Sequence, residues 1–111
     1  MRFMSLWRPR GTSPVSMERM QKLVEDEMKS GRLVATGGWD PRGPSIVVRS
    51  EGGKVAVTDG PYTEAKEAIG GYAIMEVASK EELLEATKRF LAVAGDGVCE
   101  IRELGGPPPK R

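Results

Sequence analysis

The chain has 111 residues, 39% of them hydrophobic, which suffices for one compact domain and is too short for two. Its 17 basic and 16 acidic residues leave a formal net charge of +1, too weak a field to attract nucleic acid or an anionic membrane surface. The absence of histidine removes the commonest general base and metal ligand, and the single cysteine, Cys99, cannot form an internal disulfide. Residues 1–7 are too short and too charged for a signal sequence or a membrane span. We therefore expect a cytoplasmic domain with no nucleic-acid or membrane partner.

Residues 2–7 predict a strand that is covered on both sides. Phe3 and Trp7 alternate with Met4 and Leu6, so apolar side chains fall on both faces of the strand.

A helix should follow this strand, with Ser13 as its N-cap and Pro14 in the first helical position. Gly31 should end it in the left-handed conformation that suits the residue after a helix. We expect one apolar stripe of this helix to pack in the core. The stripe consists of Met17, Met20, Val24 and Met28.

Residues 33–39 predict a second strand, followed by a turn-rich loop at 40–44. Both prolines of this loop block helix and strand continuation, and we expect the loop to line a cleft. Trp39 is a candidate platform on which a ligand can stack, although an aromatic residue at a strand end more often belongs to a core or a dimer interface.

Residues 45–49 and 54–58 are short β-branched runs that predict a hairpin with a four-residue loop at 50–53. Arg49 lies on this hairpin. It is either solvated or a clamp for the carboxylate or phosphate of a ligand.

The second half of the chain predicts a strand at 72–77, a helix and a last strand at 98–104. Ser79 should cap the helix, with Glu82 completing a capping box, and Gly95 should end it. The predicted apolar stripe of the helix consists of Leu83, Thr87, Phe90 and Ala94, widened by Leu84 and Leu91.

This element order predicts a ferredoxin-like α+β sandwich, with two helices on one face of an antiparallel sheet and a hairpin inserted between the second and third sheet strands. The other face of the sheet would carry too much apolar surface to remain in water, so a second copy should cover it and form a two-fold homodimer. The domain should span 1–104, followed by a disordered Gly/Pro-rich tail at 105–111.

Residues 59–67, Asp-Gly-Pro-Tyr-Thr-Glu-Ala-Lys-Glu, hold the main candidate site. Pro61 restricts the backbone and Asp59 can hydrogen-bond the amides that follow, so one interpretation is a simple hairpin exit. The other interpretation is that the bend directs charged groups into a cleft. There a carboxylate would act as general base, and a lysine would hold an anionic group of the ligand. The candidate catalytic residues are Asp59, Glu64 and Lys66, and the candidate ligand-binding residues are Tyr62, Glu67, Trp39, Arg49 and Arg102.

Glu100 and Arg102 lie two residues apart on a strand and share a face, which favours an ion pair over a catalytic role. Cys99 is expected to be a buried and inert thiol. The carboxylates of Asp59, Glu64 and Glu67 can ligate magnesium or calcium, but zinc would lack its usual nitrogen and sulfur donors. We expect no metal and no cofactor.

The 59–67 segment resembles the DGPFAETKE signature of the DGPF branch of the YCII-related family, with Tyr62 in place of the usual Phe and Lys66 in its expected place. The resemblance extends over nearly the whole chain and implies a dimeric α+β barrel. It also implies that the protein binds a small molecule or acts on one in a polar cleft of the barrel. Some members are proposed to use a His/Asp pair; without histidine, Asp59 would act alone or with Glu64. The alternative is an accessory or regulatory protein associated with extracytoplasmic-function sigma factors.

Overall fold

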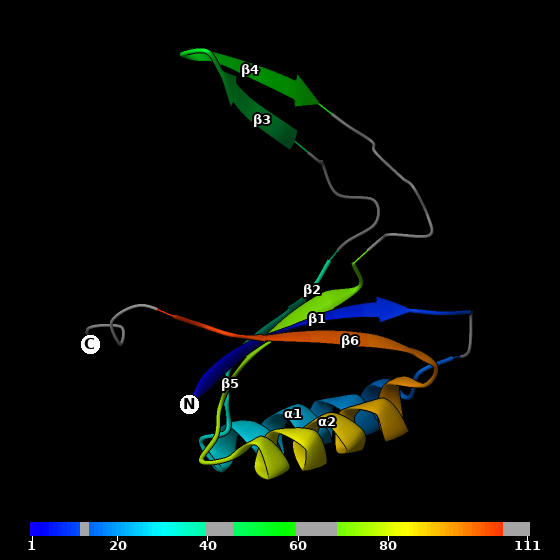
Figure 1. Ribbon diagram of the computed structural model, residues 1–111. Helices are drawn as coiled ribbons and strands as arrows, with labels where there is room; N and C mark the ends of the chain where they lie inside the picture. The colour runs from blue at the N-terminus through cyan, green and yellow to red at the C-terminus, as the bar shows by residue number, and fades with distance from the viewer. Residues whose placement is uncertain (12–13, 40–45, 60–68, 106–111) are drawn as a thin grey trace.

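The computed structural model describes residues 1–11, 14–39, 46–59 and 69–105. A four-stranded sheet carries two helices on one face, and a two-stranded hairpin stands apart from it (Figure 1). In chain order the elements are β1 (Arg2–Pro9), α1 (Met17–Lys29), β2 (Leu33–Gly38), β3 (Ile46–Glu51), β4 (Lys54–Asp59), β5 (Gly71–Glu76), α2 (Lys80–Ala94) and β6 (Gly97–Glu103). The predicted α+β class, with a ferredoxin-like order of elements, is confirmed.

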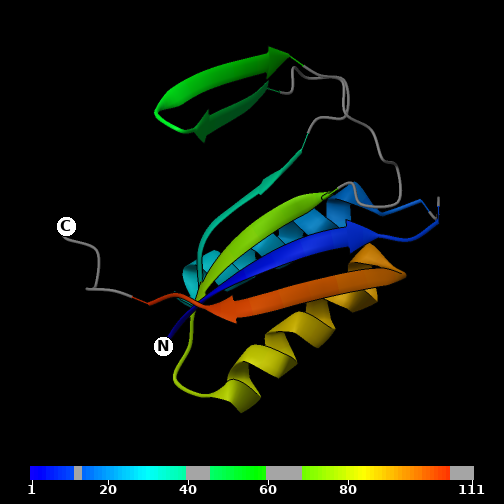
Figure 2. The same cartoon turned by 45° about the horizontal axis from the view of Figure 1, so that its top comes forward.

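The sheet has the strand order β2-β5-β1-β6, and its paired strands are antiparallel (Figure 2). In the central strand β1, Ser5 lies opposite Ala73 and Ile101, and Trp7 lies opposite Cys99. These side chains share the face that packs on the helices, because directly opposed residues lie on the same side of a sheet.

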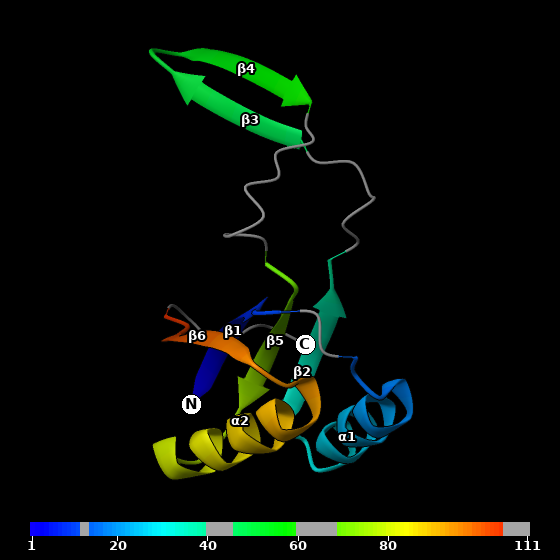
Figure 3. The same ribbon diagram turned by 90° about the vertical axis from the view of Figure 1, so that its right-hand side faces the viewer.

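Strand alternation then places Met4 and Leu6 of β1 on the opposite face of the sheet, together with Tyr72 and Ile74, which oppose them on β5. Figure 3 shows both helices on one side of the sheet, and this is the side opposite Met4 and Leu6. The predicted division of apolar residues between two faces is therefore confirmed.

The core lies between the sheet and α2 and is small. It is flanked by partly buried Phe3, Ala73 and Ile101 of the sheet and by Val24 of α1. The buried members of this core are Leu33, Met75, Val77, Leu83 and Ala86.

The start of α1 differs from the prediction. Ser16 is the N-cap, three residues beyond Ser13, and its Oγ accepts a hydrogen bond from the backbone N–H of Arg19 at 3.2 Å. Both serines precede the apolar run, and the later one satisfies an amide of the first turn. The C-terminal prediction holds, because Gly31 follows the helix with φ +83°.

The predicted apolar stripes of both helices need correction. Met17 is 75% exposed and Met28 is also exposed, while Leu23 and Glu27 face inward alongside Met20 and Val24. In α2 the exposed Leu84 lies outside the stripe and buried Ala86 lies within it. The stripes are thus rotated by about one residue from the positions that hydrophobicity alone favours. Ser79 and Gly95 cap α2 as predicted, with the Ser79 Oγ accepting from the Glu82 N–H at 3.1 Å.

The turn of the β3–β4 hairpin is tighter than the predicted loop at 50–53. Ser50 and Glu51 belong to β3, where Glu51 pairs with Lys54, so only Gly52 and Gly53 form the turn. Their φ angles of +57° and +80° give the two left-handed positions of a type I′ turn, which glycine adopts without strain.

Three predictions fall on parts of the chain that lie outside the described residues. They concern the 40–44 loop, the signature segment beyond the backbone of residue 59, and the tail from residue 106.

Candidate functional site

The three predicted ligand-binding residues that the structure describes lie in separate parts of the molecule. Trp39 follows β2 at one edge of the sheet and is 56% exposed. Arg102 lies on β6 at the other edge, and exposed Arg49 lies on the separate hairpin. The structure does not bring them together around one cleft.

The other predicted site residues lie in the signature segment. Of this segment the structure describes the backbone of Asp59, which ends β4 opposite Ile46. Tyr62, Glu64 and Lys66, like Glu67, fall outside the described residues, so their convergence on a polar cleft stays a prediction.

Arg102 takes part in an ion-pair chain on β6 and β1. Its Nε donates to Glu100 Oε2 at 3.1 Å, and Arg8 donates to the other oxygen of the same carboxylate at 3.0 Å. Hydrogen bonds from Arg102 and Arg8 lower the pKa of Glu100. The predicted same-face pair of Glu100 and Arg102 is confirmed.

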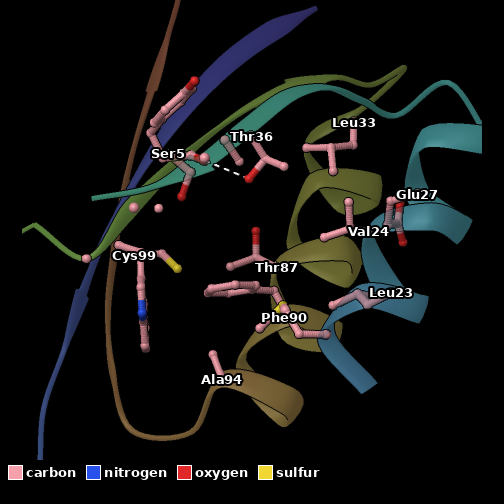
Figure 4. A pocket seen from close by; sticks show the side chains of 18 of the residues that line it. Ser5, Leu23, Val24, Glu27, Leu33, Thr36, Thr87, Phe90, Ala94 and Cys99 are labelled. Carbon is pink, nitrogen blue, oxygen red and sulfur yellow. Dashed lines mark hydrogen bonds between the residues drawn. The ribbon is translucent and has the colours of Figure 1, made fainter. Parts of the chain in front are cut away.

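A cavity of about 470 Å³ lies between the helices and the sheet. Leu23 and Val24 reach it from α1, and Phe90 reaches it from α2 (Figure 4). Trp7 of β1 also lines it. The Trp7 and Phe90 rings meet edge to face, with their centroids 5.1 Å apart. The lining also includes Met17, so the cavity opens to the surface beside the start of α1.

The cavity lining is mainly apolar, but the helix-facing side of the sheet and α2 contribute three hydroxyl groups and a thiol to it. Thr36 and Thr87 donate their hydroxyl protons to backbone carbonyls, those of Tyr72 and Leu83, each at 2.8 Å. A hydroxyl oxygen that donates still has lone pairs with which to accept. The lining therefore offers a few hydrogen-bond acceptors in a mainly apolar cavity that is open on one side, with Thr36 exposed. The polar groups come from Ser5, Thr36, Thr87 and Cys99 (Figure 4).

Cys99 is half-buried on the helix-facing side of β6 and lines this cavity. Burial raises the pKa of its thiol, and a hydrogen bond with Ser5 opposes that effect in part. The thiol is thus mainly protonated at neutral pH, which makes it a weak nucleophile.

Glu27 of α1 forms the charged end of the cavity lining. Its Oε2 accepts from Arg32 Nε at 2.6 Å, and its Oε1 accepts from Arg89 Nε at 3.0 Å. Burial opposes ionisation, but the hydrogen bonds and charges of Arg32 and Arg89 outweigh it and lower the pKa of Glu27. This carboxylate is therefore ionised and fully engaged.

Comparisons with known proteins place the chain in a family. The model of the YCII-related domain matches residues 1–105. The chain belongs to the YCII-related family. An uncharacterized protein of Rhizobium meliloti (strain 1021) is 27% identical over 101 residues, covering 84% of this chain and 82% of that protein.

Among solved structures, the YCII-related chain is similar to the periplasmic divalent cation tolerance protein CutA from Archaeoglobus fulgidus. The two are 12% identical with a TM-score of 0.41, and the match covers 100% of this chain and 89% of the other.

Among residues 1–11, 14–39, 46–59 and 69–105 of this YCII-related chain, no three acidic or cysteine side chains gather closely enough to hold a metal ion. No helix in the same ranges is long and apolar enough to cross a membrane.

The cavity of this YCII-related domain was not predicted from the sequence. Thr87 and Phe90 were assigned to a packed core, and Ser5 and Thr36 were not singled out. One signal was available: Ser5 lies on a sheet strand between the large apolar residues Met4 and Leu6, and Thr36 lies on another strand beside the small residues Ala35 and Gly37. Small polar residues facing a core leave room there unless a bulky neighbour fills it.

Proposed function

We propose that this YCII-related protein binds a small, uncharged and largely apolar molecule in the cavity between its helices and its sheet. The observation that carries the proposal is the cavity itself. Its volume of about 470 Å³ lies in the range of roughly 300–1,000 Å³ that small-molecule sites occupy. Its lining, apolar with a few polar groups, is also typical of such sites.

The charges around the cavity favour a neutral ligand. Among the described residues of the lining, Glu27 carries the charge, and two arginines already hold its carboxylate. A charged ligand would lose its hydration without gaining a free counter-ion from this described part of the lining. A single hydroxyl or amide N–H on the ligand can instead donate to the oxygens of Ser5, Thr36 or Thr87.

A thermal-shift screen with matched probes tests the proposal. We expect 2-naphthol to raise the melting temperature in a concentration-dependent way, because a ligand that binds only the folded state stabilises it. Its charged analogue 2-naphthoate should produce no shift. A shift in melting temperature with 2-naphthoate but not with 2-naphthol contradicts the proposal. So does the absence of a shift with every neutral compound of a wider probe panel.

Cys99 offers a local readout because it is the only cysteine in the chain and lines the cavity. Bound ligand should slow alkylation of its thiol by iodoacetamide. At a ligand concentration of ten times Kd, the free fraction predicts a roughly tenfold slower reaction. A stabilising ligand that leaves this rate unchanged binds elsewhere.

The DGPF-like signature supports a second site of polar character, which we keep as a proposal. Asp59, Glu64 and Lys66 combine potential general bases with a cation within eight residues. Asp59→Asn separates the two sites: it should leave binding of a cavity ligand unchanged and abolish binding of a ligand held by the signature. A loss of stability without a loss of binding would instead identify Asp59 as a turn residue.

We also propose that the protein is a homodimer that pairs its open sheet faces, as in a dimeric α+β barrel, and that it works in the cytoplasm. Met4, Leu6, Tyr72 and Ile74 support the dimer, because they place apolar side chains on the sheet face that neither helix covers. Contiguous apolar surface of this kind is usually buried by a partner. A lone cysteine agrees with a reducing compartment.

A further inference from the structure

The β3–β4 hairpin is an arm with one apolar face. In its antiparallel register Val48 lies opposite Val57, and directly opposed residues share a face. Ile46 and Val55 lie two positions along their strands and therefore fall on the same face. These four β-branched side chains are 60–68% exposed. The other face is more polar, with Arg49 opposite Ala56 in the register.

In the described part of the chain, no other helix or strand packs on the apolar face of the arm. There the two strands pack on each other and make no extensive contact with the sheet or the helices. A two-stranded hairpin by itself is at best marginally stable in water. An arm with four exposed apolar side chains on one side therefore needs a surface against which to pack.

The arm and the open sheet face lie on the same side of the molecule. The chain leaves the sheet for the arm at the end of β2 and returns at the start of β5, where the Trp39 N–H donates to the Gly70 carbonyl at 3.1 Å. From there the hairpin stands on the side of the sheet opposite the helices (Figures 1 and 3). A molecule that covers the sheet face through Leu6 and Ile74 thus comes within the reach of the arm.

We propose that the arm packs its apolar face against a second copy of this chain and clasps the partner that covers the open sheet face. The inference rests on the homodimer proposed above. In a two-fold pair each protomer offers the same two surfaces, so every arm and every sheet face is covered at once. A net charge of +1 per chain opposes this association only weakly.

Three variants test the arm and the sheet face separately by sedimentation equilibrium. Val57→Glu places a carboxylate on the apolar face of the arm, and Ala56→Glu places one on the other face of the same strand. We expect Val57→Glu to raise the dimer dissociation constant by about tenfold or more, because a buried, unpaired carboxylate is costly, while Ala56→Glu leaves it unchanged. Leu6→Glu, on the open sheet face, should also weaken the dimer.

The outcomes distinguish failure of the arm from failure of the dimer. A dimer that Leu6→Glu dissociates and Val57→Glu does not affect overturns the arm and keeps the sheet-face pairing. A monomeric wild-type protein overturns both the arm contact and the sheet-face pairing. The exposed arm would then be free to bind a different protein, as an accessory role requires. Equal effects of Val57→Glu and Ala56→Glu also overturn the arm, because its two faces would then be equivalent.

Hydrogen exchange of the wild-type protein provides a test that needs no substitution. The amides of residues 46–59 should be protected at concentrations where the dimer forms and should exchange rapidly after dilution below its dissociation constant. Protection of the hairpin that does not change on dilution contradicts the proposal.

Discussion

Glu27 is the buried charged residue in the described part of the chain. It lies on the inward face of α1, and its carboxylate is shared by two arginines, from the segment before β2 and from α2. One carboxylate thereby ties α1 to α2 and to the start of the second strand. In a fold whose core is small, this tie helps to hold the wall of the cavity in place.

Replacing this carboxylate should destabilise the fold. Glu27→Gln keeps the size of the side chain but removes the charge that both arginines use, and we expect the free energy of unfolding to fall by about 1–3 kcal/mol. Urea denaturation measures the loss. Glu25→Gln, on the exposed face of the same helix, is the control and should change stability by less than about 0.5 kcal/mol. Equal effects of the two substitutions would show that the buried ion pair contributes nothing.

The same carboxylate predicts a dependence of stability on pH. The pKa of Glu27 is lower in the folded state than in the unfolded state, so its contribution is complete above the ordinary carboxyl range and is lost as pH falls through the folded pKa. The difference in unfolding free energy between wild type and Glu27→Gln should therefore be constant above about pH 5 and shrink below about pH 4. A difference that grows on acidification would contradict the direction of the shift.

At the scale of elements, one close contact fixes how β6 meets β1. Gly97 begins β6 beneath the Trp7 indole, where an added Cβ would lie only 2.6 Å from the Arg8 carbonyl oxygen and would also collide with the Trp7 ring. The ring is held in turn by Phe90 of α2. A side chain at position 97 therefore has to displace backbone or a packed aromatic residue.

Gly97→Ala should lower the free energy of unfolding by about 1–3 kcal/mol, as overpacking at a rigid position does. Gly105→Ala is a matched control, because a Cβ there meets no atom within 4 Å. Melting curves of the two variants decide the matter. If both melt like the wild type, β6 adjusts freely and the contact does not fix its position.

The elements show which features local sequence determines. The caps at Ser79 and Gly95, the glycine after α1 and the alternation along β1 depend on neighbouring residues, and these were predicted. Ser13 and Ser16 are both suitable caps, so local chemistry could not choose between them. The turn at Gly52-Gly53 was placed correctly, but its length follows from the pairing of Glu51 with Lys54 across the strands.

The candidate site was much less predictable than the fold. Arg89 lies 62 residues from Glu27 in the sequence, so their ion pair exists only through tertiary packing. The cavity is defined by volume that side chains of α1 and the sheet leave unfilled, and a pattern of apolar residues does not reveal such a volume. The charged signature drew attention because its chemistry is visible in the sequence itself.

At the scale of the molecule, the sheet has two apolar faces, and the described part of the chain supplies helices for only one. Light scattering at micromolar concentration should give a mass of about 24 kDa, twice the 12.1 kDa of one chain, because the open face carrying Met4, Leu6 and Ile74 is expected to be buried by a second copy. A mass of one chain under these conditions would contradict the homodimer.

The central claim is that the cavity between helices and sheet holds a small apolar ligand, and calorimetric titration of two alanine variants tests it most directly. Ala94 is buried and lines the cavity, whereas Ala92 is exposed on the same helix. Ala94→Leu should fill part of the cavity, leave the melting temperature equal or higher, and weaken binding of 2-naphthol at least tenfold. Ala92→Leu should bind like the wild type. Unchanged binding by the folded Ala94→Leu variant would contradict the account, because the ligand would then lie outside the cavity.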